Sequence, residues 1–493
     1  MSNFFLERLN RNAKKYGSRV AIRFLEEQIT YLELDNETDL IAQKIKKFIY
    51  NSEQRAIVIY QSRGIQFIKY IIAILKCNCY YVPLENTVPI ERLKYIYNDV
   101  NALMIISENE VSLEDNYKVL NPSNITKLET VNISSSNHME KDLVYVMYTS
   151  GTSGKPKGVK IKYSNLKNLV YSFNKIVYHN FDNKVNVGVI ASFCFDASVK
   201  QIFCALFYGH SLIIADGTVR YFGSKIHRFL NQNDIMICDM TPSHLKLMLL
   251  QKKKEKSKTP YLIIGGEKLT WNLLKNYKKD IDENCTFINV YGPTECCVDV
   301  SYNIVKEVKK ENGNVPIGVP LDNTQLILID DNGSRITEPY IIGELYVYGK
   351  QVGSGYVNDV KNSFIKNINN EIIGYKTGDL GEYNDDMEII ILSRKDRQVK
   401  LNGFRIELDE ISVAIEEYCS NQSYVCLFEI NNSLHLVAFI VGRCREREVI
   451  EHLKKVLVSY MIPKKIVSVK EIPLTDNGKV DEKKLLNIYK YGN

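Results

Sequence analysis

The stretch from Tyr148 to Gly158, YTSGTSGKPKG, combines residue types that suit a phosphate chain. Gly151, Gly154 and Gly158 free the backbone to curl, so that its N–H groups can point at phosphate oxygens. The same stretch also supplies hydroxyl donors and cations: Thr149, Ser150, Thr152, Ser153, Lys155 and Lys157. The spacing G-x-x-x-x-G-K-[ST] of a Walker loop is absent. Taken alone, the stretch fits a phosphate-binding loop and an exposed surface loop equally well.

The elements that position this loop are predicted from apolar periodicity. Residues 56–60 (AIVIY) predict a buried strand, and residues 64–76 place their apolar side chains on one helical face. Further strands are predicted at 80–84, 103–106, 187–191, 235–238 and 262–264. This alternation predicts an α/β fold with layered, largely parallel sheets.

A domain boundary is expected at residues 393–397, SRKDR, a charged and strand-poor stretch after the strand-like residues 388–392. The remainder, to Asn493, contains one long amphipathic helix and short strands. That is enough for a small α+β domain of about 100 residues.

Composition excludes several classes of protein. The 493 residues are 45% hydrophobic and 25% charged, with a net charge of +6, which suits an anionic substrate such as ATP without requiring nucleic acid or a membrane. No run of about 18 apolar residues predicts a membrane span, and the N-terminus lacks a secretory pattern. The 11 cysteines lack zinc-site spacing and indicate small buried hydrophobes in a reducing cytoplasm.

The loop and a series of later motifs resemble the acyl-adenylate-forming superfamily, which includes acyl-CoA synthetases, luciferases and the adenylation domains of nonribosomal peptide synthetases. The adenylation domains are the most similar. The matching motifs follow in order: Asn289–Glu295 (NVYGPTE), Gly343–Gly349 (GELYVYG), Tyr375–Leu380 (YKTGDL), Ser393–Lys400 (SRKDRQVK), Asn402–Glu407 (NGFRIE) and Asn477–Asp481 (NGKVD). The resemblance covers essentially the whole chain.

The resemblance implies a large N-terminal domain of layered mixed sheets with helices, residues 1–393, and a small mobile α+β C-terminal domain, residues 398–493. The hinge would be residues 394–397, with Asp396 as the pivot between two half-reactions. Gly403 would line the tunnel for a phosphopantetheine arm.

The resemblance also implies roles in ATP binding. Tyr291 would stack on adenine, Asp379 with Arg394 would bind the ribose hydroxyls, and Glu295 would ligate Mg²⁺. Lys479 would contact the substrate carboxylate and the α-phosphate. Thr149 joins Lys479 and Glu295 as the expected catalytic residues. The expected ATP-binding set is completed by Ser150, Gly151, Thr152, Ser153, Gly154, Lys155, Lys157, Asn289, Gly292 and Thr294.

The substrate class depends on Phe195–Ser198 (FDAS), because an aspartate at this place in amino-acid-activating relatives pairs with the substrate α-ammonium group. Asp196 could instead cap the helix that follows it. The implied pocket lining is Asp196, Ala197, Lys200, Asp239, Ile263, Gly265, Val290, Val298 and Asp299, with Lys479.

Lys200 and Asp239 place opposite charges in this pocket. The lysine suits a substrate side-chain carboxylate, with Asp239 or Asp299 holding it in place. The whole set resembles the pocket of glutamate-activating adenylation domains, so L-glutamate is expected first, and aspartate or a substituted glutamate next. Alternatively, Lys200 and Asp239 neutralise each other and the pocket takes a small neutral amino acid.

The expected enzyme is therefore a free-standing, cytoplasmic ligase that uses ATP and Mg²⁺ and passes its aminoacyl group to a separate phosphopantetheinylated carrier protein. No carrier domain follows Lys479, and no nucleic-acid partner or membrane insertion is expected. A D-alanine–carrier protein ligase for teichoic acid D-alanylation is the main alternative. A catalytically silent binding protein of the same fold is the second.

Overall fold

The computed structural model describes residues 4–49, 53–108, 111, 113–122, 140–151, 154–251, 256–280, 284–309, 313–358, 363–430, 433–475 and 479–492. Two predicted ATP-binding residues, Thr152 and Ser153, lie outside these ranges. The chain forms two compact units. The first comprises residues 1–85, 100–147 and 158–395, and the second comprises residues 86–99, 148–157 and 396–493.

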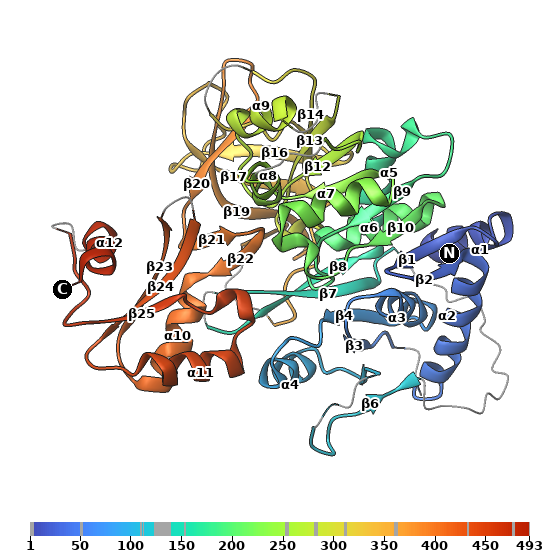
Figure 1. The fold of residues 1–493 in the computed structure, drawn as a ribbon, viewed down its shortest axis with the longest axis horizontal. Coiled ribbons are helices and arrows are strands. Elements are labelled where there is room, and N and C mark those ends of the chain that lie inside the picture. Colours follow the sequence, from blue (N-terminus) through green and yellow to red (C-terminus); the bar gives the residue numbers. More distant parts are fainter. Residues whose placement is uncertain are drawn as a thin grey trace. The chain divides into compact units, whose positions relative to one another are not determined.

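The largest sheet of the first unit has nine strands in the order β15-β14-β13-β12-β11-β9-β10-β1-β2 (Figure 1). Neighbouring strands from β13 to β1 are parallel, whereas β2, β14 and β15 are antiparallel additions at the two edges. The strands are β1 (Val20–Phe24), β2 (Glu27–Thr30), β9 (Asn186–Val189), β10 (Ser211–Ile214), β11 (Ile235–Met240), β12 (Tyr261–Ile264), β13 (Thr286–Tyr291), β14 (Ser301–Val305) and β15 (Val319–Pro320).

Helices cover both faces of this sheet. One face packs on α7 (Gly223–Gln232), α8 (Pro242–Leu249) and α9 (Trp271–Asp280) in one hydrophobic core. The other face shares a second, larger core with α1 (Phe4–Lys15), α2 (Tyr31–Lys46), α3 (Ile65–Lys76), α5 (Tyr163–Ile176) and α6 (Ala197–Tyr208). Alternate residues of each strand therefore face different helices.

A six-stranded sheet of order β6-β5-β3-β4-β7-β8 contributes to the same larger core. Its strands are β3 (Ala56–Tyr60), β4 (Tyr80–Leu84), β5 (Met104–Ile106), β6 (Val119–Leu120), β7 (Leu143–Thr149) and β8 (Lys157–Lys162). β3 is buried at every position, as the apolar run AIVIY predicts. A five-stranded antiparallel sheet completes the unit: β16 (Thr324–Ile329), β17 (Gly343–Gly349), β18 (Phe364–Lys366), β19 (Ile372–Tyr383) and β20 (Ile389–Arg394).

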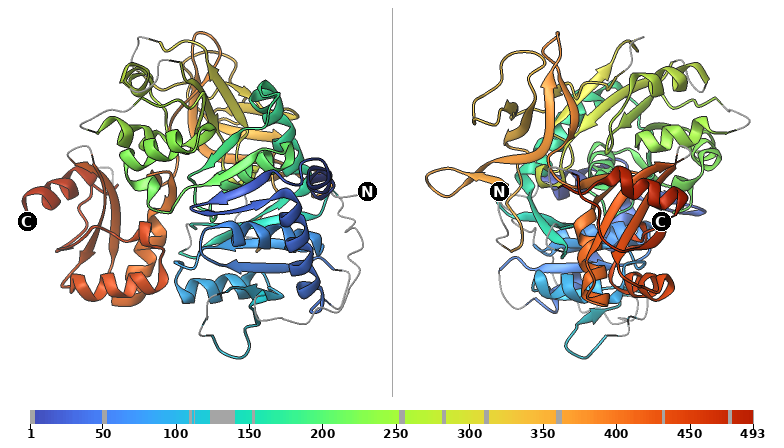
Figure 2. Two further views of the ribbon diagram at one scale, coloured as in Figure 1. Left: turned by 45° about the vertical axis from the view of Figure 1, so that its right-hand side comes forward. Right: turned by 90° about the vertical axis from the view of Figure 1, so that its left-hand side faces the viewer.

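The second unit contains the hairpin β21 (Gln398–Leu401) and β22 (Phe404–Glu407), and a sheet of β23 (Ser423–Ile430), β24 (Ser433–Val441) and β25 (Lys465–Val469), orange to red in Figure 2. Leu485 of α12 (Glu482–Tyr491) packs on one face of that sheet. The unit also holds α4 (Ile90–Asp99), α10 (Leu408–Cys419) and α11 (Glu446–Val456).

The α/β fold predicted from the sequence is confirmed, with small shifts at the element ends. Two details were wrong. The 393–397 stretch is not strand-poor, because Ser393 and Arg394 pair with Leu380 and Asp379 at the end of β20. Where the structure describes the C-terminal part, it contains three helices, α10, α11 and α12, rather than one, and Ser420 ends α10 with a left-handed φ of 54°. The domain limits 1–393, 394–397 and 398–493 stay a prediction.

Within the described ranges, no helix combines the length and the apolar character needed to cross a membrane. The 11 cysteines are all free, and eight of them are buried. These eight agree with the prediction that the cysteines are small buried hydrophobes, whereas Cys194, Cys419 and Cys444 are only partly buried.

Candidate active site

The carboxyl ends of β11, β12 and β13 lie next to one another because these strands are parallel neighbours in register. Asp239 pairs with Ile263, and the Gly265 N–H donates to the Met240 carbonyl over 3.0 Å. A Cβ built on Gly265 would lie 2.7 Å from the side chain of Val290. The carboxyl ends of these strands therefore bring together four predicted pocket residues: Asp239, Ile263, Gly265 and Val290.

Asp196, another predicted substrate-binding residue, lies at the start of α6. Asp196 precedes the helix with helical angles, φ −60° and ψ −29°, and its side chain makes no capping hydrogen bond. Its role as a helix cap is therefore not supported. Burial raises the pKa of Asp196 to about 6, while the Thr294 hydroxyl acts in the opposite direction.

Lys200 lies one turn further along α6 and is 2% exposed. Its Nζ atom is 2.7 Å from an oxygen of Asp239 and 2.7 Å from an oxygen of Asp299. It also lies 4.5 Å from the centre of the Phe173 ring. We refer to Lys200, Asp239 and Asp299 as the Lys200 cluster.

The Lys200 cluster is electrostatically coupled. Burial alone would lower the Lys200 pKa, but the two carboxylates raise it above its ordinary value. Burial raises the pKa of Asp239 to about 6, against the opposing effect of Lys200. With all three groups ionised, the cluster carries one net negative charge. An ammonium group has three N–H donors, so one remains for a further acceptor.

A strained turn presents Asp299 to this cluster. Val298 has a φ of 75°, and the Asp299 N–H donates to the Cys297 carbonyl over 3.0 Å, which makes a γ-turn centred on a β-branched residue. Gly292 lies directly against it: a Cβ at Gly292 would be 2.2 Å from the Val298 carbonyl oxygen. The position of Asp299 therefore depends on the turn at Val298 and on the close packing of Gly292 against that turn.

Two residues that sequence reasoning missed hold the segment before Asp196. The Glu85 carboxylate accepts from the Ser192 hydroxyl over 2.6 Å and from the Phe193 N–H over 3.1 Å. The Arg63 guanidinium donates to the carbonyls of Ala191 and Ala215, each over 2.7 Å. In the sequence, these two residues stand out only as charged residues next to buried strands. Because neither belongs to a motif, their role was not predicted.

Three of the predicted nucleotide-binding residues meet in the first unit. The Asp379 carboxylate, on β19, accepts a hydrogen bond from the Tyr291 hydroxyl and another from Arg394 over 3.0 Å. Asp379 is 5% exposed. Burial, followed by the neighbouring Asp379 carboxylate, raises the Tyr291 pKa, so the phenol stays neutral and donates.

Glu295, the predicted Mg²⁺ ligand, is fully buried and accepts a 2.8 Å hydrogen bond from the Tyr356 hydroxyl. No group of three or more candidate metal ligands occurs among the described residues. A single carboxylate nevertheless fits Mg²⁺, which takes one or two protein carboxylates together with phosphate oxygens and waters.

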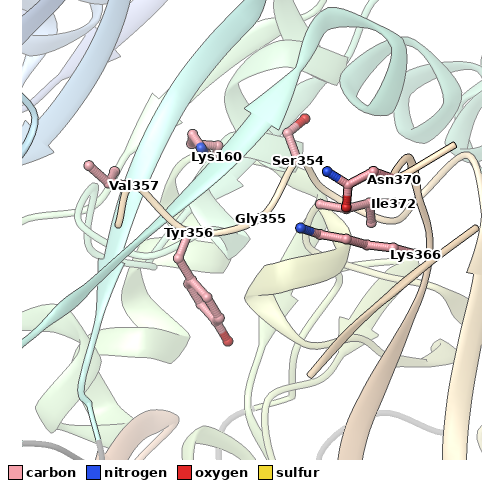
Figure 3. Close-up of a pocket in the computed structure, with 8 residues that line it drawn as sticks. All are labelled: Lys160, Ser354, Gly355, Tyr356, Val357, Lys366, Asn370 and Ile372. Atoms are coloured by element: carbon pink, nitrogen blue, oxygen red, sulfur yellow. The ribbon is translucent and has the colours of Figure 1, made fainter. Parts of the chain in front are cut away.

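Tyr356 also lines a surface pocket of about 350 Å³, together with Lys160, Lys366 and Asn370. Figure 3 shows the Tyr356 ring extending away from the Lys366 ammonium group. None of the residues predicted to bind substrate or ATP lines this pocket. The side-chain amide of Asn289, a predicted ATP-binding residue, donates a hydrogen bond to the Pro316 carbonyl over 2.9 Å.

The phosphate-loop stretch is described with the second unit. The Gly151 N–H donates to Glu410 over 2.9 Å, and the Ser150 hydroxyl bonds the Arg405 carbonyl and the Glu407 N–H. The Thr149 hydroxyl is buried and has no hydrogen-bond partner among the described residues. The Gly151 N–H already donates to an anionic group, and the Thr149 hydroxyl is available as a further donor. Both features fit a loop that binds a phosphate.

The remaining predicted residues of the loop and the C-terminal part are partly placed. Lys155 is exposed, and Lys157 begins β8. Asn402 and Gly403, with φ values of 52° and 81°, form the two-residue turn of the β21–β22 hairpin. Asp396 accepts from the Gln398 N–H, and Lys479 is exposed.

Two family models match the chain, "AMP-binding enzyme" over residues 9–357 and "AMP-binding enzyme C-terminal domain" over residues 430–479. Bacitracin synthase 1 of Bacillus licheniformis is 32% identical over 498 residues, which cover 97% of this chain. The chain spans only 9% of the length of that relative.

Solved structures that share the fold include the following two. One is holo-PA1221, a nonribosomal peptide synthetase protein containing adenylation and PCP domains, with a TM-score of 0.85 and 20% identity, covering 99% of this chain and 84% of that one. The other is the adenylation domain AlmE of Vibrio cholerae in complex with glycyl-adenosine-5'-phosphate, with a TM-score of 0.82 and 20% identity, covering 99% of this chain and 98% of that one.

Proposed function

Because the chain belongs to the AMP-binding enzyme family, we propose that it activates an amino acid with ATP and then passes the aminoacyl group to a phosphopantetheine thiol. In the first step, a substrate carboxylate oxygen bonds the α-phosphorus of ATP, the bond to the β-phosphate bridging oxygen breaks, and pyrophosphate leaves. In the second step, the thiol sulfur bonds the acyl carbon, AMP leaves and the thiol proton is released.

The observation that carries this proposal is the placement of the Asp196 carboxylate next to Thr294 and the fully buried Glu295. Asp196 forms no ion pair with a cation among the described residues, and such a carboxylate suits a substrate α-ammonium group. Glu295 would hold Mg²⁺, which supplies positive charge to the phosphates. Tyr291 and Asp379 would orient the nucleoside, and Lys479 would neutralise the charge that develops at the α-phosphorus.

L-Glutamate is our first choice of substrate. The pocket pattern resembles that of glutamate-activating domains, and the free N–H of Lys200 can donate to a side-chain carboxylate. A small neutral amino acid, including D-alanine, is the second candidate, because two carboxylates already neutralise Lys200. A D-alanine–carrier protein ligase would fall in that class.

The thiol acceptor would be the phosphopantetheine of a carrier protein, a partnership supported by the PCP domain that PA1221 contains, and we propose that this carrier is a separate protein. The limits 1–393, 394–397 and 398–493, with Asp396 as the hinge and Gly403 at the tunnel, belong to this proposal. Neither a nucleic-acid partner nor membrane insertion forms part of it. The cytoplasm stays the predicted location.

The test is amino-acid-dependent ATP–pyrophosphate exchange across the L-amino acids, D-alanine and D-glutamate. We expect the highest exchange with L-glutamate and none with Asp196→Asn, whereas the surface variant Asp234→Asn should match the wild type. A lead for D-alanine would replace glutamate and assign the D-alanine ligase function. Absence of exchange with every amino acid would favour the catalytically silent protein.

A further inference from the structure

The Lys200 cluster has a charge balance that a glutamate side chain would disturb. One ammonium group already bonds two carboxylates, each over 2.7 Å, and the three side chains are at most 10% exposed. A third carboxylate in the same place would leave two net negative charges without solvent to screen them.

In the part of the chain that the structure describes, no cation other than Lys200 is found near Asp239 to offset that charge. The groups that face it are Lys200, Asp299 and the neutral Gln201 amide, with Tyr178, Cys204 and Cys238 further out. Burial raises the pKa values of Tyr178, Cys204 and Cys238, so all three are neutral near pH 7.

We propose that Asp239 takes up one proton from solvent when an acidic substrate binds, and that the protonated carboxyl then donates a hydrogen bond to the substrate side-chain carboxylate. This inference rests on the proposed glutamate activity. The proton restores the single net negative charge of the free cluster, and Lys200 keeps Asp299 as its ionised partner. Asp239 becomes the residue that couples substrate choice to pH.

The ionisation behaviour of Asp239 agrees with this assignment. Its pKa of about 6 in the free protein leaves it mostly ionised above pH 7, so the proton must be taken up on binding. Binding of an acidic substrate should therefore weaken as pH rises, by up to about tenfold per pH unit. A neutral isostere such as L-glutamine brings no third charge and should show no such dependence.

The first experiment measures KM for L-glutamate and for L-glutamine by ATP–pyrophosphate exchange between pH 6.5 and 8.5. Their ratio removes the ionisation of ATP and of the α-amino group, which both substrates share. We expect KM(Glu)/KM(Gln) to rise steadily with pH in the wild type and to be flat in Asp239→Asn. Asp234→Asn, the same change at the opposite, exposed end of β11, should keep the wild-type slope. A flat wild-type ratio, or an unchanged slope in Asp239→Asn, overturns the proposal.

A second experiment needs no variant and so does not depend on the folding of Asp239→Asn. Calorimetry of the wild-type protein at pH 8, in two buffers of different ionisation enthalpy, counts the protons taken up with the sulfamoyladenosine analogues of glutamate and of glutamine. We expect about one more proton for the glutamyl analogue. Equal proton counts with both analogues bound would overturn the inference while leaving glutamate activation intact. Absence of glutamate-dependent exchange at every pH would instead count against the proposed function itself.

Discussion

Buried charge is the main feature at the scale of single residues. Lys200, Asp239 and Asp299 come from α6, β11 and the turn before β14, and they are separated by up to 99 positions in the sequence. Each would be strongly destabilising if left alone in this environment. Together they form a cluster whose net charge affects which substrate side chain can bind.

Replacing Lys200 with methionine should leave two buried carboxylates without their cation. We expect the free energy of unfolding to fall by about 3–5 kcal/mol, because one partner of a buried ion pair is removed. Denaturant unfolding monitored by circular dichroism measures this change. Adding Asp239→Asn to Lys200→Met should recover part of the loss.

The exposed Lys225 provides the control for that substitution. Lys225→Met should alter the unfolding free energy by less than about 0.5 kcal/mol. An equally small effect of Lys200→Met would contradict the cluster's role in stability.

Asp196 gives a pH-dependent prediction. Because its pKa is raised from 3.8 to about 6 by burial, the stability it contributes is complete below pH 3.8 and is lost as pH rises through 6. Asp196→Asn does not titrate, so the variant should gain stability relative to the wild type between pH 4 and pH 7. Unfolding free energies at pH 4, 5, 6 and 7 measure the difference.

Asp216 should behave in the opposite direction, because hydrogen bonds from Thr218 lower its pKa. Asp216→Asn should therefore lose stability relative to the wild type as pH rises from the lowered pKa to 3.8, and the difference should stay constant between pH 4 and pH 7. If Asp196→Asn also showed a constant difference between pH 4 and pH 7, the raised pKa of Asp196 would be wrong.

At the scale of elements, the site depends on strand parity and one strained turn. Ile237 belongs to the core shared with α6, whereas Cys238 and Met240 belong to the core shared with α7–α9. Asp239, two residues after Ile237, therefore faces α6 and meets Lys200. The γ-turn at Val298 supplies the third member of the cluster.

Gly292→Ala tests the turn. A Cβ at this position would lie 2.2 Å from the Val298 carbonyl oxygen and 2.6 Å from the Asp299 Cα, so the turn must move. We expect ATP–pyrophosphate exchange to fall at least tenfold, since Asp299 shifts relative to Lys200. Gly217→Ala, where no atom lies within 4 Å of the new Cβ, should keep full exchange. Equal activity in both variants would show that the turn does not position the site.

Much of this arrangement could be predicted from the sequence. The buried runs predicted β3 and β4 with their observed ends, and the motifs singled out Asp196, Asp379 and Glu295, whose roles stay predictions. Glu85, Arg63 and the Val298 turn could not be predicted, since their roles arise from contacts between segments over 100 positions apart or from a backbone angle. The break at Ser420 was missed because a non-glycine residue adopts the left-handed conformation there.

At the scale of the whole molecule, two compact units suit the two half-reactions of the proposed function. Lys479 belongs to the second unit, together with the proposed hinge at Asp396 and the Asn402–Gly403 turn. Each half-reaction should therefore respond differently to substitutions in this unit.

Lys479→Ala should abolish adenylate formation, because the charge that develops at the α-phosphorus loses its counter-ion. Thioester formation from a supplied aminoacyl-AMP should stay within about threefold of the wild type. Single-turnover assays of each half-reaction separate the two effects. Lys483→Ala, an exposed lysine four residues further on, should affect neither step. Equal losses in both half-reactions would contradict the role assigned to Lys479.

The helical backbone that runs from Asp196 into α6 also limits the length of the substrate side chain. Asp196 and Lys200 are four residues apart, so they lie on one helical face with an axial rise of about 6 Å between them. If Asp196 binds the substrate α-ammonium group and Lys200 binds the side-chain carboxylate, the fixed spacing of these two residues selects the number of carbon atoms between the two substrate charges. L-Aspartate would be one methylene too short and L-2-aminoadipate one too long. Each should lose about 10- to 200-fold in kcat/KM relative to L-glutamate.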